Sequence, residues 1–321
     1  MELHQLRYFV AVAESGSFSR AAERCHVSQP SLSQQIAKLE GRLGQRLLDR
    51  LGRRVQLTGA GRQLLERALP ILAAVDDAER RLRDAEGALD GWLAVGAIPT
   101  VAPYLLPPAL KRFLRRHPQV ELTVHEDVTR QLVTAVAAGE LDLALVALPI
   151  DDPRLELEAL FTEPLLLAMV AGHRLARRRR LTIDDLRTER FILLNEMHCL
   201  GEQTLSFCRA NDCQPRIACH SAQITTVQSL IALGQGVSLL PDMARRADRD
   251  KRRCYRPLAG GRPTRTVAAL WHRHRYHSPA AERFLGVLRE LAREQGRGRP
   301  GWLVPPREGR ANGAPGQACG T

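Results

Sequence analysis

Two cysteines and a histidine lie close together in the segment HCLGEQTLSFC, from His198 to Cys208. A thiol can be oxidised to a sulfenic acid, which then condenses with a second thiol to give a disulfide. If Cys199 and Cys208 stood at the two ends of one α-helix, they would be separated by roughly 13–14 Å and would face opposite sides. A disulfide needs Cα atoms within about 7 Å. Oxidation would therefore have to refold the segment, so the pattern indicates a possible redox switch.

The same spacing has a plainer interpretation. In a chain with seven cysteines, two of them nine positions apart are more often inert core residues. A reactive Cys199 would need a lowered pKa or a local proton shuttle, because a free cysteine has a pKa near 8.5 and only the thiolate attacks. The N–H groups at the start of a helix would favour the thiolate, and His198 could hydrogen-bond nearby. We interpret the remaining cysteines as structural or incidental; they are Cys25, Cys213, Cys219, Cys254 and Cys319.

Length and composition indicate a multidomain protein of the cytosol. The chain has 321 residues, of which 44% are apolar, enough for two or three domains with real cores. The first residues, MELHQLRYFVAVAES, lack the features of a signal peptide, and no apolar run of about 18 residues is present to span a membrane. In the cytosol thiols stay reduced, so a disulfide there is usually catalytic or sensory.

The net charge of +12 fits a polyanionic partner, but the signal is weak. Only three of the 47 basic residues are lysines, which indicates a coding bias toward arginine. Much of the excess lies away from the N-terminus, in residues 177–180 and after Arg289. We interpret residues 177–180 as a solvated loop.

The N-terminal sixty residues have the pattern of a helix-turn-helix. Apolar residues recur at helical spacing over residues 2–14. Ser17 is a plausible N-cap for a second helix that extends to Cys25, and Ser28 for a third that ends at Gly44. Pro30 lies in the first turn of the third helix, where a missing N–H costs nothing. Two helices joined by a tight turn indicate DNA binding.

Polar side chains are concentrated where that third helix would enter the DNA groove. They can hydrogen-bond base edges or phosphates. The stretch from Leu47 to Thr58 predicts a short hairpin wing whose arginines point toward phosphates. The predicted DNA-binding residues are Ser28, Gln29, Pro30, Ser31, Ser33, Gln34, Arg50, Arg53 and Arg54.

A long helix is predicted next. Apolar residues alternate at spacings of four and three, as in a helix that pairs with another helix. They are Leu64, Ala68, Ile71, Val75, Ala78, Leu82, Ala85 and Leu89. An amphipathic helix packed on its own domain remains an alternative. Pro70 should kink or interrupt the helix.

From Gly91 onward strand and helix patterns alternate, which predicts α/β units with a parallel or mixed sheet. Strands are expected over 92–99, 120–126, 141–148, 165–170, 191–194 and 237–241, and helices over 104–116, 132–138 and 226–233. The predicted organisation is a DNA-binding domain over 1–58, a linker helix over 59–90, a regulatory domain with two α/β subdomains over 91–293, and a disordered tail over 294–321.

The sequence from Leu6 to Arg50 resembles the LysR-type transcriptional regulators, and the resemblance extends to about residue 293. Four further segments resemble the hydrogen-peroxide-sensing members of that family: residues 97–107, 125–132, 198–208 and GQGVSLLP at 234–241. The resemblance implies a winged helix-turn-helix, a dimerising linker helix and a two-subdomain effector module like the periplasmic binding proteins. It also implies a homotetramer, a dimer of dimers, that bends promoter DNA and acts with RNA polymerase.

The resemblance also implies roles for individual residues. Cys199 matches the cysteine that attacks peroxide, and Cys208 matches the resolving cysteine. His198, Thr100 and Thr129 match polar residues around the peroxide, and Arg265 matches a pocket arginine. Thr100 and Thr129, taken without the resemblance, could be plain strand-end caps. One departure is Glu202, which stands where an aspartate is expected.

The leading hypothesis is a peroxide-sensing transcriptional activator, which would not be an enzyme. Two other functions are alternatives to it. A LysR-type regulator could bind a small metabolite between its subdomains, with incidental cysteines. A thiol peroxidase would use similar chemistry but would leave the DNA-binding domain unexplained. No GxSxG, HExxH, P-loop or dinucleotide motif is present. We expect no cofactor and no metal: Cys25 and His26 have no matching ligand cluster, and His272, His274 and His277 are interpreted as a solvated patch.

Overall fold

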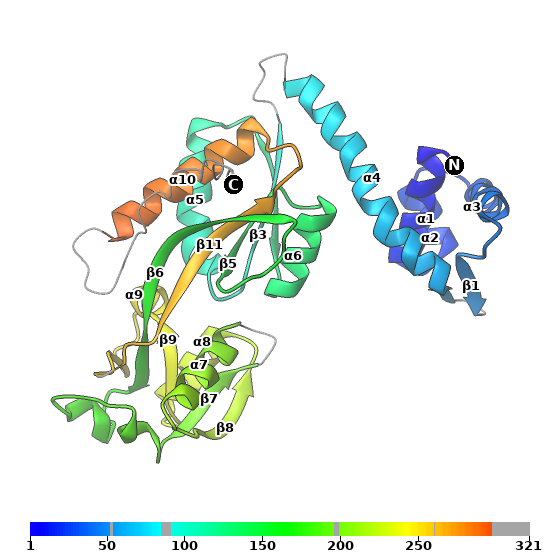
Figure 1. Ribbon diagram of the computed structural model, residues 1–321. Helices are drawn as coiled ribbons and strands as arrows, with labels where there is room; N and C mark the ends of the chain where they lie inside the picture. The colour runs from blue at the N-terminus through cyan, green and yellow to red at the C-terminus, as the bar shows by residue number, and fades with distance from the viewer. Residues whose placement is uncertain (52–53, 85–90, 196–198, 260, 297–321) are drawn as a thin grey trace, which may run out of the picture.

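The computed structural model describes residues 1–51, 54–84, 91–195, 199–259 and 261–296. Three apolar cores are present in this part of the chain: one at the N-terminus and two in the α/β region. Figure 1 shows the long helix α4 leading from the N-terminal helices toward the α/β region. No helix among the described residues is long and apolar enough to cross a membrane.

The N-terminal unit consists of three helices and a hairpin. Helices α1 (Leu3–Ser15), α2 (Phe18–Arg24) and α3 (Gln29–Leu43) precede the antiparallel strands β1 (Leu48–Leu51) and β2 (Arg54–Leu57). The predicted caps are confirmed, since Ser17 accepts a hydrogen bond from the Arg20 N–H and Ser28 accepts one from the Ser31 N–H. Helix α3 ends at Gly44, whose φ of 64° is left-handed and suits glycine. The helix-turn-helix with a hairpin wing is thus present.

Helix α4 (Gly59–Asp84) is continuous through Pro70, so the predicted interruption is wrong. Pro70 is exposed, so water can satisfy the carbonyl that loses its N–H partner. The first part of the predicted seam packs on the N-terminal core through Leu64 and Ala68. Further along, Ile71 and Leu82 are 41% and 74% exposed. Ala85 and Leu89 lie outside the described residues.

The first α/β subdomain is built on a mixed sheet. Strand β3 (Trp92–Ala97) pairs in parallel with β4 (Glu121–Glu126) and with β5 (Leu143–Ala147). Strand β11 (Thr264–His272) lies antiparallel to β5. Helices α5 (Ala102–Arg116) and α10 (Pro279–Gly296) pack against each other, and α6 (Thr129–Ala138) packs on β5 and β11. Gly96 has no room for a Cβ, because Leu132 and Leu141 lie directly over it.

The second subdomain has its own small sheet. Strands β7 (Arg190–Leu194) and β8 (Arg216–Ser221) are parallel, and Phe191 bridges to Val237 beside β9 (Ser238–Pro241). Strands β9 and β10 (Arg253–Arg256) both pair with β6 (Leu155–Val170). Helices α7 (Cys199–Ala210), α8 (Ile224–Ala232) and α9 (Asp242–Ala247), with short 3-10 helices at Arg174–Arg177 and Asp184–Leu186, complete it.

Two long strands join the subdomains. Strand β6 pairs with β11 along its first half and with β9 and β10 along its second half, so it belongs to both subdomains. Figure 1 shows β6 and β11 running side by side between the two bodies. The chain enters the second subdomain on β6 and returns on β11, which confirms the predicted α/β fold class with a two-subdomain module.

Most predicted strands and helices are present, with boundaries that differ by a few residues except for β6, which begins at Leu155, ten residues before the predicted start at Leu165. Strands β8, β10 and β11 and helices α9 and α10 were not predicted. Helix α10 continues to Gly296, so the first three residues of the predicted tail are helical. Residues 297–321 lie outside the described part of the chain.

Candidate functional site

Helix α7 carries the two cysteines of the predicted switch near its opposite ends. Cys199, its first residue, is partly buried and packs against the core of the first subdomain. Cys208 is 0% exposed and belongs to the core of the second subdomain. The two thiols thus face different cores, as the helical spacing predicted. A disulfide between them cannot form while α7 is intact.

Two contacts fix the position of the first turn of α7. Gly201 lies against the end of β7, where an added Cβ would come within 2.4 Å of the Leu194 carbonyl oxygen. Gln203, one turn after Cys199, donates from Nε2 to the carbonyl oxygen of Leu148 at 2.9 Å, across to the first subdomain. The face that carries Cys199 is thereby held at the boundary between the subdomains.

The Cys199 thiol has competing influences on its pKa. Burial, the largest effect, raises the pKa above its ordinary value. The charge of Arg265, a hydrogen bond from Thr129, and the N–H groups of Leu200 and Cys199 itself all act in the opposite direction. The N–H groups at the helix start therefore favour the thiolate, as predicted. Burial outweighs them, so the pKa of Cys199 lies above its ordinary value.

Two buried polar atoms near α7 are unsatisfied. Thr129 Oγ1 and Gln203 Oε1 are both buried with no hydrogen-bonded oxygen or nitrogen partner among the described residues. Thr129 begins α6 and its hydroxyl lies toward the Cys199 sulfur. Buried polar groups in proteins are nearly always satisfied by protein or ordered water. Thr129 Oγ1, whose one contact is with the Cys199 sulfur, therefore has unused hydrogen-bonding capacity that suits a small polar molecule bound beside the thiol.

Arg265 is the centre of a fully buried ion pair. It donates from Nε to Glu163 Oε1 at 2.9 Å, and both side chains have 0% exposure. Its other nitrogens donate to Thr100 Oγ1 at 2.8 Å and to the Thr100 carbonyl oxygen at 3.0 Å. Glu163 also accepts the Met243 N–H of α9 at 2.9 Å. Arg265 on β11 and Glu163 on β6 thus connect the two crossing strands, the β3–α5 turn and α9.

The predicted peroxide-site residues fall into two groups. The structure brings Cys199, Thr129 and Arg265 together, and Thr100 joins them through Arg265. Cys208 lies apart from them in the other core. His198 lies outside the described residues. Glu202 is exposed, and its carboxylate accepts hydrogen bonds from Ser206 and Arg209 on the solvent side of α7.

The Cys208 thiol is strongly disfavoured as a thiolate. Burial, the nearby Cys213 thiol and a hydrogen bond between the two raise the pKa of Cys208 to about 12. Cys213 follows α7 and is 1% exposed. Burial raises the pKa of Cys213, while the Arg187 charge and the hydrogen bond from Cys208 oppose that rise.

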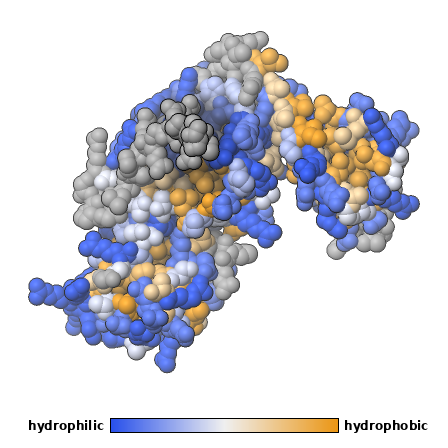
Figure 2. Space-filling view, viewed as in Figure 1, coloured by the Kyte–Doolittle hydropathy of each residue, from blue (hydrophilic) through white to orange (hydrophobic). Residues whose placement is uncertain are grey.

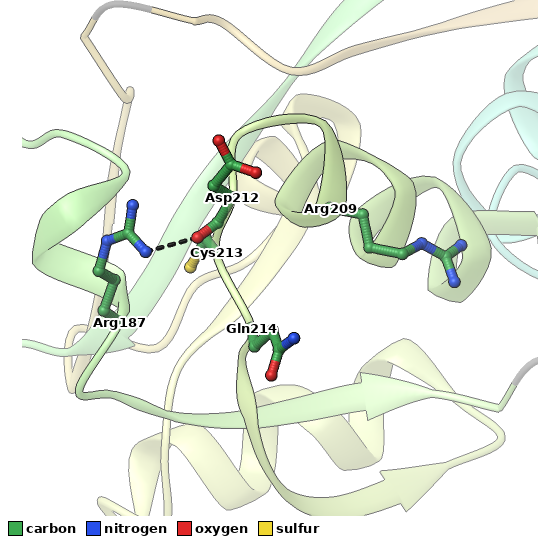
Figure 3. Close-up of a pocket in the computed structure, with 5 residues that line it drawn as sticks. All are labelled: Arg187, Arg209, Asp212, Cys213 and Gln214. Atoms are coloured by element: carbon green, nitrogen blue, oxygen red, sulfur yellow. Dashed lines mark hydrogen bonds between the residues drawn. The ribbon is translucent and has the colours of Figure 1, made fainter.

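Two pockets lie near these residues. One, of about 610 Å³, opens between the subdomains, where Tyr104 of α5 faces Gln228 of α8 and Arg253 of β10. The other, of about 410 Å³, lies at the end of α7. Figure 3 shows Arg187 pointing toward the turn that carries Asp212 and Cys213, and Arg187 donates to the Asp212 carbonyl oxygen at 2.5 Å. Arg209 also lines this pocket.

The predicted DNA-reading residues lie at the start of α3. The side chains that are exposed there are Ser28, Gln29, Pro30, Ser31 and Gln34, and Ser33 is partly exposed. Arg50 and Arg54 lie in the hairpin strands, with side chains outside the described part, and Arg53 lies between the described ranges. Among the described residues no group of three or more His, Cys, Asp or Glu side chains is arranged to hold a metal ion.

Several residues of the site were missed by the sequence analysis. Glu163 and Gln203 carry no local pattern, because their partners lie far away in the chain. Gly201 was a detectable signal, since a glycine inside a helix often marks a close approach of another backbone. Cys213 was set aside as incidental but contacts Cys208.

Two family models match the chain. The model described as "Bacterial regulatory helix-turn-helix protein, lysR family" matches residues 3–62, and "LysR substrate binding domain" matches residues 86–293. A curated relative from Dickeya chrysanthemi named "Hydrogen peroxide-inducible genes activator" is 37% identical over 272 residues, covering 84% of this chain and 89% of the relative.

Solved structures are similar along nearly the whole length. A full-length OxyR variant from Pseudomonas aeruginosa has a TM-score of 0.74 at 32% identity, over 91% of this chain and 95% of that one. An OxyR variant from Corynebacterium glutamicum, titled as bound to H2O2, has a TM-score of 0.62 at 31% identity, over 91% and 93% of the two chains.

Proposed function

The chain belongs to the LysR family of bacterial transcriptional regulators, and from that premise we propose that it is a DNA-binding regulator that senses hydrogen peroxide. The observation that carries the proposal is the surroundings of Cys199. Cys199 is the first residue of α7, and its thiol accepts a hydrogen bond from the Thr129 hydroxyl. The positive charge of the buried Arg265 also favours the Cys199 thiolate. The relative named as a peroxide-inducible activator and the OxyR structures support it.

The chemistry begins with the Cys199 thiolate. Its sulfur attacks one peroxide oxygen, the O–O bond breaks, and the departing hydroxide takes up the thiol proton as water. The product is a sulfenic acid. The Thr129 hydroxyl, which donates to the Cys199 sulfur in the reduced protein, is the donor that we assign to the departing oxygen once the S–O bond forms. Thr100, and His198 by the resemblance, complete the proposed set, with Arg265 as the fixed positive charge.

Resolution then requires Cys208 to leave its core. Its sulfur attacks the sulfur of the sulfenic acid, water leaves, and the Cys199–Cys208 disulfide forms. Because the two cysteines stand at opposite ends of α7, the helix must unwind for this step. Side chains that now fill the second core, Leu200 among them, must move with it. The proposed switch is therefore α7 itself, which is helical and packed in the reduced protein and unwound in the disulfide form.

The output of the switch is proposed to be a change in how the chain assembles on promoter DNA. The exposed start of α3 supplies the DNA-reading residues. Figure 2 shows apolar side chains along α4 beside the N-terminal unit, where Ile71 and Leu82 are exposed. Strands β4 and β8 lie at sheet edges and expose Val124 and Ile217. We propose that these surfaces take part in self-association into a dimer of dimers. The resemblance further implies that the assembly acts with RNA polymerase in the cytoplasm.

Peptide mapping by mass spectrometry tests the proposal. Full-length reduced protein is exposed briefly to micromolar hydrogen peroxide and its thiols are trapped at once. We expect a Cys199–Cys208 disulfide to form within seconds. Cys25, Cys219 and Cys254 should remain free thiols and should therefore be recovered in the alkylated form. Slow or scattered oxidation contradicts the proposal. A sensor also reacts roughly once per reduction cycle, so sustained peroxide turnover with a reductant would indicate a peroxidase instead.

A second candidate is a regulator that binds a small metabolite. The pocket between the subdomains favours it, since the exposed side chains of Glu126, Gln223 and Thr225 offer polar groups beside apolar Ile224. This candidate predicts no rapid loss of two thiols per chain. A thermal-shift screen of metabolites against the reduced protein tests it, because a ligand that binds the native state raises its stability.

A further inference from the structure

Cys213 lies against Cys208 because of the way α7 ends. The Cys213 N–H donates to the Cys208 carbonyl oxygen at 2.9 Å, and the Asp212 N–H donates to that of Arg209 at 3.1 Å. Asp212 has a left-handed φ of 50°. This pattern is a Schellman motif, in which the side chains of Cys208 and Cys213 meet. The thiols are hydrogen-bonded to each other.

The contact has two interpretations. In a Schellman motif the two residues are commonly an apolar pair, so two buried cysteines could simply fill the core. Two thiols in contact are also a dithiol that can close without moving α7. The Cys199–Cys208 pair lacks that property, since its formation requires α7 to unwind.

We propose that Cys213 is a second resolving residue, which takes over Cys208 from the Cys199–Cys208 disulfide. The Cys213 thiolate attacks Sγ of Cys208, the Sγ–Sγ bond to Cys199 breaks, and Cys199 leaves as a thiolate that takes up a proton. One disulfide is exchanged for another, so no external oxidant or reductant is needed. The proposal rests on the proposed function, which supplies the first disulfide.

The surroundings of Cys213 suit this role. Burial raises the pKa of the Cys213 thiol, and the Arg187 guanidinium opposes that rise by favouring the thiolate. Cys208 donates its S–H toward the Cys213 sulfur, which acts in the same direction as Arg187. Cys213, although only 1% exposed, also lines the pocket that Arg187 and Arg209 border (Figure 3). Cys208 has no arginine among the groups that act on its pKa.

The exchange has a structural consequence. Once Cys208 is paired with Cys213, Cys199 is again a thiol and α7 can refold, because the new disulfide lies at the helix end. The peroxide signal would then end by itself, while the chain remains oxidised. A sulfenic acid formed at Cys199 by a second peroxide would lack its resolving partner.

Tryptic mapping separates the two disulfides, since Arg209 lies between Cys208 and Cys213. A Cys199–Cys208 bond stays within peptide 191–209, whereas a Cys208–Cys213 bond cross-links that peptide to peptide 210–216. A second cleavage after Glu202 shows which cysteine of the first peptide carries the link. Reduced full-length protein receives one equivalent of peroxide without reductant, and samples are acid-quenched and alkylated over time.

We expect the internal disulfide to appear first and then to be lost as the cross-link through Cys208 accumulates. In Cys213→Ser protein the internal disulfide should persist, whereas Cys254→Ser, a matched change in the same subdomain, should behave as wild type. If the internal disulfide stays the sole product in wild type, or the cross-link runs through Cys199, the inference is overturned and the proposed function stands. Absence of any disulfide overturns both.

Discussion

Arg265 holds the hydroxyl of Thr100 at 2.8 Å although the two residues lie 165 positions apart. Arg265 is on β11, by which the chain returns to the first subdomain, and Thr100 precedes α5. The same guanidinium pairs with Glu163 on β6, the outgoing strand, and lies near enough to Cys199 to favour its thiolate. One buried charge therefore links β6 and β11, the two strands that join the subdomains, to the reactive thiol.

Removal of this charge should destabilise the protein strongly. Arg265→Ala leaves Glu163 buried without its ionic partner, and breaking a buried ion pair costs about 3–5 kcal/mol. Arg154→Ala removes the exposed pair with Asp152, whose arginine is 61% exposed, and should cost no more than about 1 kcal/mol. Urea unfolding of both variants measures the difference. Equal midpoints for the two variants would contradict the assigned role of Arg265.

Thr129→Val should slow the oxidation of Cys199 without loss of the fold. The variant keeps the shape but removes a hydroxyl that bonds the thiolate, a contact worth roughly ten- to a hundredfold in rate if it acts in the transition state. Stopped-flow measurement of thiol loss against peroxide concentration gives the rate constant. Thr134→Val on the same helix is the control, because that exposed hydroxyl only bonds the Arg130 carbonyl oxygen. An unchanged rate in Thr129→Val would remove Thr129 from the site.

Local signals explain which parts of the fold could be predicted. Ser17, Ser28 and Gly44 are caps that act within four residues, so the N-terminal helices were placed closely from the sequence. Strand β11 is held by β5 and β6, whose paired residues lie at least a hundred positions earlier, and nothing in its own sequence shows that pairing.

The candidate site shows the same division. The opposed directions of Cys199 and Cys208 follow from helical geometry alone. The prediction that Thr100, Thr129 and Arg265 lie near Cys199 came from the resemblance. No rule of sequence spacing predicts a contact between residues so far apart in the chain. Gln203 and Glu163 were missed for that reason, since each acts through a tertiary contact.

The rate of Cys199 oxidation should rise with pH. Its pKa is raised above the ordinary value by burial, so the reactive thiolate is a minor form at neutral pH. Each pH unit below that pKa then changes the thiolate fraction roughly tenfold. Rates measured between pH 6.5 and 8.5, a range of about two units, should therefore increase steadily with no plateau. A plateau below pH 7 would show that the thiolate already predominates there.

Gln34→Ala should weaken binding to the target promoter. Gln34 is exposed near the start of α3, where a glutamine side chain can bond a base edge. Loss of such a contact costs about 1–3 kcal/mol of binding free energy and relaxes specificity at that base pair. Fluorescence anisotropy at fixed salt measures it, with Gln235→Ala, an exposed change in the regulatory region, as control. Equal affinity of both variants for specific and random DNA would remove Gln34 from the interface.

The two cysteine variants should arrest the switch at different stages. Cys199→Ser removes the attacking thiolate, so we expect DNA binding to be retained and the peroxide response to be lost. Cys208→Ser keeps the attacking thiol, which should stop as a sulfenic acid that dimedone labels at Cys199. Because Cys208 lies in the second core and α7 need not unwind in this variant, its promoter footprint after peroxide should match that of the reduced protein. An oxidised footprint in Cys208→Ser protein would show that sulfenic acid formation alone drives the change and that unwinding of α7 is not the switch.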